Sequence, residues 1–114
     1  MPDEEPSIML TEADKGKSVR ICQNDVVQIK LNENPTTGYR WTINPMNGEV
    51  LELESSVFAL APSSGIGGGG ERILTFKARK IGTTRLELEL RREWEGARSG
   101  IDHYDLTIQV LDCT

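Results

Sequence analysis

The sequence is poor in reactive side chains. Among its 114 residues it has one histidine, His103, and two cysteines, Cys22 and Cys113, and aromatic residues make up 5% of the chain. These counts disfavour a metal site built from histidines and most enzymes that pair a nucleophile with a base. We therefore expect no catalytic residues, no metal site and no cofactor, and we expect that the protein is not an enzyme.

Long apolar runs and excess positive charge are also missing. No stretch approaches the roughly 18 to 20 apolar residues of a membrane-spanning helix, and the acidic start, residues 1–6, does not look like a secretory leader. Eighteen acidic against 13 basic residues give a net charge of −5, which repels nucleic acid at long range. We expect neither membrane nor nucleic acid as a partner. The compartment is the cytoplasm if Met1 is the native start, and the periplasm or the cell exterior if a leader was removed.

The chain does contain apolar residues at period two, which is typical of β-strands. The clearest case is Leu86, Leu88 and Leu90, which alternate with Glu87 and Glu89. The pattern predicts strands at 7–11, 19–31 with a break near Asn24-Asp25, 39–44, 50–60, 72–79, 84–91 and 103–111. This favours an all-β fold, an immunoglobulin-like antiparallel β-sandwich of about seven strands. We expect a single domain over residues 1–114, with residues 1–6 disordered.

Alternating strand directions would separate the connections into two ends of the sandwich. At one end, Pro45 to Gly48 and Lys80 to Gly82 are typical of tight turns. The other end would carry NPTTG, PSSGIGGGG and the segment 92–102. The same parity places both cysteines at the plain end. A disulfide there would stabilise the fold by roughly 4 to 5 kcal/mol, although the sequence leaves open whether the two cysteines pair.

The segment 34–39 is unusually constrained for a connection. Pro35 fixes its own φ, Thr36 and Thr37 are stiff at χ1, and Gly38 can adopt a positive φ to turn into the next strand. Such a loop can present two hydroxyls with little entropy to lose on binding. The alternative is an ordinary Pro–Gly loop without a binding role.

The other two connections at this end have alternatives of their own. Gly65 to Gly70 matches GxGxxG, but a dinucleotide fingerprint precedes a helix, whereas residues 72–78 alternate as a strand. The glycines form either a flexible linker or a loop whose bare backbone lies close to a partner. Arg92 and Trp94 are residue types that dominate interface hot spots, and Trp94 could instead fold back over the sandwich. We expect His103 to be a solvated strand residue.

These three segments together resemble the signature loops of the chagasin-type inhibitors of cysteine peptidases. NPTTGY before Trp41, a glycine-rich GxGG stretch and Arg-x-Trp occur in that order, and the resemblance extends from about Ile8 to the C-terminus. The family's third loop usually reads Arg-Pro-Trp, and Glu93 stands here in place of the proline.

The resemblance implies an immunoglobulin-like inhibitor, monomeric when free, that binds papain-like cysteine peptidases of the cathepsin L and B type reversibly and tightly. The NPTTG loop would enter the active-site cleft, and the other two loops would clasp its sides. The implied peptidase-binding residues are Asn34, Pro35, Thr36, Thr37, Gly38, Tyr39, Gly67, Gly68, Gly69, Gly70, Arg92 and Trp94. The alternative function is an immunoglobulin-like ligand-binding or adhesion module that binds through a sheet face.

Overall fold

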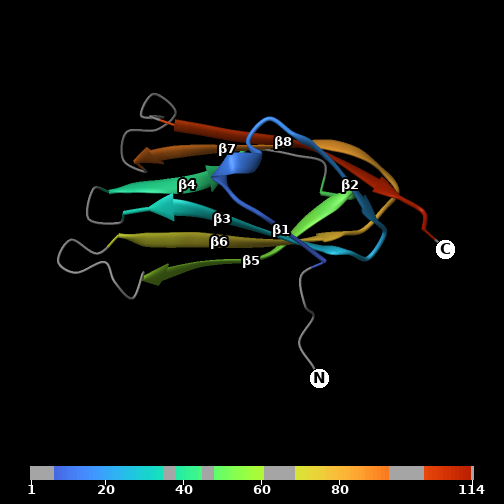
Figure 1. The fold of residues 1–114 in the computed structure, drawn as a ribbon, viewed down its shortest axis with the longest axis horizontal. Coiled ribbons are helices and arrows are strands. Elements are labelled where there is room, and N and C mark those ends of the chain that lie inside the picture. Colours follow the sequence, from blue (N-terminus) through green and yellow to red (C-terminus); the bar gives the residue numbers. More distant parts are fainter. Residues whose placement is uncertain (1–6, 35–37, 45–47, 61–68, 93–101, 114) are drawn as a thin grey trace, which may run out of the picture.

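The computed structural model describes residues 7–34, 38–44, 48–60, 69–92 and 102–113. These ranges form strands and one short 3₁₀ helix, arranged as two layers that run along the long axis of the molecule (Figure 1). The elements are β1 (Ile8–Leu10), η1 (Glu12–Asp14), β2 (Ser18–Cys22), β3 (Val26–Glu33), β4 (Tyr39–Ile43), β5 (Leu51–Leu60), β6 (Gly70–Ala78), β7 (Gly82–Arg92) and β8 (Asp102–Leu111). The all-β sandwich is confirmed. The expected disorder of residues 1–6 lies outside the described residues.

Each layer is a four-stranded sheet. One sheet has the strand order β1-β3-β6-β5, and the other has the order β2-β8-β7-β4. Two edge pairs depart from the expected antiparallel order, because β1 pairs with β3 in parallel and β2 pairs with β8 in parallel. Parallel neighbours need a long connection between them, and here the intervening chain supplies it: β2 of the opposite sheet lies between β1 and β3, and five strands of the two sheets lie between β2 and β8.

The predicted strand 19–31 is in fact two strands, because the chain changes sheets at the predicted break. Asn24 has a φ of 76°, a left-handed conformation that asparagine tolerates better than most residues. The carboxylate of Asp25 accepts a hydrogen bond from the backbone N–H of Cys22 at 2.8 Å and closes the turn. β2 therefore joins β8 while β3 joins β1 and β6, and the described residues hold eight strands where about seven were predicted.

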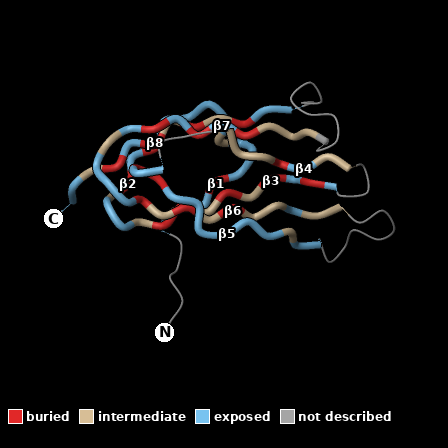
Figure 2. The backbone as a smooth tube through the Cα atoms, turned by 180° about the vertical axis from the view of Figure 1, so that it is seen from behind, coloured by how far each residue is buried: buried red, intermediate tan, exposed pale blue. Residues whose placement is uncertain are grey.

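The core lies between the two sheets and consists of the apolar members of the alternating pattern. Along β3, β6 and β8, buried residues alternate with exposed or half-buried ones, whereas in β5 only Leu51 is buried (Figure 2). Trp41 is buried among them, as its place in the alternation predicts. The side chains most completely buried are Tyr104, Phe76, Ile29, Leu31, Leu51, Leu74, Leu86, Leu88, Leu106, Ile108, Val27 and Val110.

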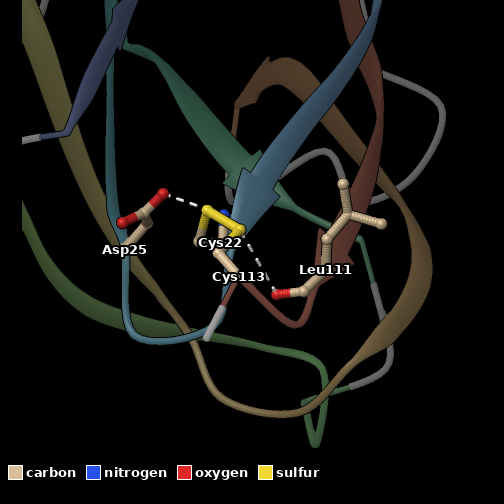
Figure 3. The surroundings of a disulfide bond; sticks show 4 residues. All are labelled: Cys22, Asp25, Leu111 and Cys113. Atoms are coloured by element: carbon tan, nitrogen blue, oxygen red, sulfur yellow. Dashed lines mark hydrogen bonds between the residues drawn. A yellow bond between two sulfur atoms is a disulfide. The ribbon is translucent and has the colours of Figure 1, made fainter.

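The two ends of the sandwich differ as predicted. β3, β5 and β7 finish at one end, and β4, β6 and β8 begin there (Figure 1). We call this the loop end. At the opposite end, Cys22 closes β2 and Cys113 follows β8, and the two form a disulfide with their Cα atoms 5.5 Å apart (Figure 3). The pairing that the sequence left open is therefore present in the structure.

Candidate functional site

The candidate site is the loop end. Of the residues predicted to bind a peptidase, the structure describes Asn34, Gly38, Tyr39, Gly69, Gly70 and the backbone of Arg92. The remaining predicted residues, Pro35, Thr36, Thr37, Gly67, Gly68 and Trp94, lie outside the described residues. The strand register nevertheless fixes where the three connections are rooted.

Paired strand ends in both sheets carry these roots. In one sheet Gly70 stands opposite Glu33 on one side and opposite Leu60 on the other. In the other sheet Tyr39 stands opposite Arg92. The predicted residues from three distant parts of the sequence therefore meet at one end of the sandwich.

Gly38 has the backbone conformation that the sequence predicts. Its φ is 84°, in the left-handed region, immediately before β4 begins. A residue with a Cβ would be strained there by roughly 1 to 2 kcal/mol. Glycine at position 38 therefore sets the direction in which the chain enters β4.

Glu33 is the main residue of this end that sequence reasoning missed. β3 continues to Glu33, two residues beyond its predicted end at 31, and the alternation brings the Glu33 side chain to the inner face. That side chain is only 1% exposed. Its Oε2 accepts the backbone N–H of Trp41 at 2.9 Å, and its Oε1 accepts Nη2–H of Arg72 at 2.8 Å. The sequence does contain a sign of this network, because the alternation places the carboxylate of Glu33 at the next inward position after Leu31. A buried charge requires partners, so such a position predicts an ion pair or hydrogen bonds.

Arg72 is the second member of this buried network. Its side chain is 13% exposed, and its Nε lies 3.2 Å from both carboxylate oxygens of Glu33. On the other side, its guanidinium carbon lies 5.9 Å from the ring centroid of Phe58, and its Nη1 lies 3.4 Å from Oγ of Ser56. Arg72 thus connects the end of β3 with the middle of β5.

A second hydrogen bond joins Trp41 to the end of β3. Its indole N–H donates to the backbone carbonyl of Asn32 at 2.9 Å. The side-chain amide of Asn32 in turn donates to Glu12 of η1 at 2.9 Å. The bonds from Trp41 to Glu33 and to Asn32 cross from one sheet to the other, where no strand ladder joins β3 to β4.

The two described glycines of the glycine-rich stretch have different surroundings. A Cβ added to Gly70 would overlap the carbonyl oxygen of Ala59 and would lie 2.9 Å from Cζ of Phe58. A Cβ added to Gly69 would meet no atom within 4 Å. Close packing of β6 against β5 therefore requires glycine at position 70, whereas position 69 faces open space.

Leu60 is a further residue of the loop end that the sequence did not single out. It closes β5, directly opposite Gly70, and it is 63% exposed. An exposed leucine beside the root of a glycine-rich connection adds apolar contact area to this end of the molecule.

The described residues offer little for catalysis. His103 is exposed, as predicted, and its Nδ1 lies 3.5 Å from a carboxylate oxygen of Glu89. Burial raises the pKa of Tyr104, whose hydroxyl donates to the backbone carbonyl of Thr11 at 2.8 Å. Within the described ranges no group of three or more His, Cys, Asp or Glu could hold a metal ion. Nor does that part of the chain include a helix of the length and apolarity needed to cross a membrane.

An immunoglobulin-like sandwich with three rooted connections at one end defines a class of proteins that bind partners through loops. The sequence profile of the chagasin family of peptidase inhibitors, I42, matches residues 20–108. The chain therefore belongs to the chagasin family of peptidase inhibitors. Family membership favours an inhibitor over an enzyme and over an adhesion module, and it confirms the resemblance seen in the sequence.

Individual relatives agree with this assignment. Amoebiasin-2 of Entamoeba histolytica is 34% identical over 88 residues, which cover 76% of this chain and 72% of that protein. Chagasin of Trypanosoma cruzi is 28% identical over 106 residues, which cover 89% of this chain and 96% of chagasin. The crystal structure of EhICP2, a cysteine protease inhibitor from Entamoeba histolytica, superposes with a TM-score of 0.80 at 26% identity and covers 94% of this chain and 100% of that one.

Proposed function

We propose that this protein is a reversible, tight-binding inhibitor of papain-like cysteine peptidases and that it binds them with the loop end. We call residues 34–38 the wedge loop, residues 61–69 the glycine loop and residues 93–101 the third loop. Membership of the chagasin family carries the proposal. The common location of the roots of all three loops supports it.

The proposed mechanism needs shape and no chemistry from the inhibitor. A papain-like enzyme has a thiolate and an imidazolium at the floor of a cleft. A rigid loop that fills the cleft, without a carbonyl in attack geometry, blocks the substrate and is not consumed. Pro35 restricts φ near the start of the wedge loop, and Gly38 turns its end into β4 at a φ of 84°. Thr36 and Thr37 would form the polar tip.

The other two loops would contact the walls of the cleft. Gly67 to Gly69 would let the backbone approach the enzyme closely, and Leu60 would add apolar area beside them. Arg92 and Trp94 would anchor the opposite side. An interface of about 1,600 Å² in total is sufficient for a stable complex, and preorganised loops lower the entropic cost of forming it.

Titration of papain or cathepsin L with the purified protein tests this function. We expect stoichiometric, competitive loss of peptidase activity that recovers when the complex is diluted. Undiminished activity at micromolar inhibitor would refute the proposal.

A loop variant tests the role of the wedge loop separately. Thr36→Ala/Thr37→Ala shortens the polar tip and leaves Gly38 in place, because a substitution at Gly38 would also strain the backbone. We expect weaker inhibition at an unchanged melting temperature. Full inhibition by the double variant would refute the role of Thr36 and Thr37 as the polar tip.

A further inference from the structure

We propose that Glu33, Trp41 and Arg72 form a brace that holds the root of the wedge loop and the root of the glycine loop in one fixed relative position. Glu33 and Arg72 are then positioning residues for peptidase binding, although neither needs to touch the peptidase. This inference rests on the proposed function and assigns a role to residues outside the three loops.

The brace closes the root of the wedge loop. Glu33 directly precedes this loop, and Trp41 follows it within β4. β3 and β4 belong to different sheets, so no ladder of backbone hydrogen bonds joins them. The bonds from Trp41 N–H to Glu33 and from the Trp41 indole to Asn32, each 2.9 Å, span this gap. They fix the separation and direction of the two strand ends from which the wedge loop starts.

The same carboxylate reaches the root of the glycine loop. Arg72 lies two residues after the start of β6, and its guanidinium binds both oxygens of Glu33. Phe58 and Ser56 of β5 also contact that guanidinium. The strands that enter and leave the glycine loop are therefore linked through Arg72 to the strands that enter and leave the wedge loop.

A buried ion pair suits this role better than it suits stabilisation. Removing two charges from water offsets most of their attraction, so an apolar pair of similar volume would serve stability as well. An apolar pair would not set directions, whereas a carboxylate that accepts from a guanidinium and from a backbone N–H fixes both partners in angle and distance. A cleft-filling loop depends on such precision, because misplacement by about 1 Å weakens every contact it makes.

Two conservative variants test the brace. Glu33→Gln keeps an acceptor for Trp41 N–H but removes the ion pair, and Arg72→Lys keeps the charge but removes the planar bidentate contact. For each, the inhibition constant against papain is measured at a temperature where circular dichroism shows the variant fully folded. We expect an inhibition constant at least tenfold higher than that of the wild type, mainly through faster dissociation.

Val110→Ala is the matched control. Val110 is buried in the same core but lies near the end of β8, at the disulfide end. It should lower the melting temperature while changing the inhibition constant less than twofold. Wild-type inhibition by both folded brace variants would overturn the proposal, and so would an equal loss of inhibition in Val110→Ala. If Glu33→Gln does not fold, Arg72→Lys decides the outcome.

A second readout separates the brace from the proposed function. Hydrogen exchange at the backbone amide and at the indole N–H of Trp41 reports on the root of the wedge loop without any peptidase, because both groups donate to the end of β3. We expect exchange at both groups to be at least tenfold faster in Arg72→Lys and unchanged in Val110→Ala. Failure of the wild type to inhibit would refute the proposed function alone, whereas unchanged exchange in Arg72→Lys would refute the brace.

Discussion

Loss of the Cys22–Cys113 disulfide should lower stability strongly without weakening inhibition. The disulfide joins residues 91 positions apart, so it restricts nearly the whole unfolded chain. In the chain-entropy model a loop of that length removes about 15.5 cal/mol/K from the unfolded state, or about 4.6 kcal/mol at 25 °C. For a chain of this size 1 kcal/mol changes the melting temperature by about 4 °C. The variant Cys22→Ser/Cys113→Ser should therefore melt about 15 to 20 °C below the wild type.

The assay pairs thermal melting with peptidase titration. Papain-like enzymes are assayed with a reductant to keep the thiolate, so the double serine variant defines the behaviour of the protein without its disulfide. Below its melting temperature the variant should inhibit like the wild type, because the disulfide lies at the end opposite the loops. A decrease in melting temperature of less than about 5 °C would refute the chain-entropy reasoning. A weaker inhibitor that is still folded would refute the separation of the two ends.

Four further substitutions probe single features of the fold. Gly38→Ala places a Cβ at a φ of 84° and should lower the free energy of unfolding in urea by about 1 to 2 kcal/mol. Gly70→Ala forces β5 and β6 apart and should cost about 1 to 3 kcal/mol, whereas Gly69→Ala, which meets open space, should cost much less. Tyr104→Phe removes a buried hydrogen bond and should cost about 1 kcal/mol at pH 7. Because burial raises the pKa of Tyr104, wild-type stability should fall by about 1.4 kcal/mol per pH unit above about pH 10 relative to Tyr104→Phe.

Each of these expectations has a contrary result. Equal stability of the Gly69 and Gly70 variants would show that β5 moves away from an added Cβ without cost. A Gly38 variant as stable as the wild type would mean that the turn into β4 can relax to a negative φ. For Tyr104, the folded state favours the protonated, neutral phenol. The stability that this phenol contributes is therefore complete below its pKa in the unfolded chain and declines as the pH rises above that value. Parallel pH profiles of the two proteins would refute a buried phenol.

The strands and the loop end could be predicted because their signals are local. Alternation marks β7 through Leu86, Leu88 and Leu90 whatever the rest of the chain does, and parity then groups the connections. The change of sheet after Cys22 could not be predicted in the same way. A turn at Asn24 is visible in the sequence, but the partner of β2 is β8, far along the chain, and that choice depends on long-range packing.

The brace could not be predicted from the sequence for a related reason. The sequence shows a glutamate after an alternating run, but the arginine that neutralises it follows from the register of β3 against β6. Leu31 stands opposite Arg72, which brings the guanidinium diagonally across from Glu33. Gly70 is similar, since its need for glycine arises from Phe58 and the β5 backbone and not from its own neighbours in the sequence.

Binding and stability make conflicting demands when they depend on the same residues, and the two ends of the sandwich separate them. A binding end needs exposed backbone, a glycine in the left-handed region and a buried ion pair, and none of these features adds much to stability. The opposite end can compensate, because a disulfide acts mainly on the unfolded chain and places no demand on the geometry of the loops. Substitutions at sites this far apart should combine additively in free energy. Inhibition should therefore respond to Glu33 and Arg72 far more than to Cys22 and Cys113, while the melting temperature should respond strongly to the loss of the disulfide.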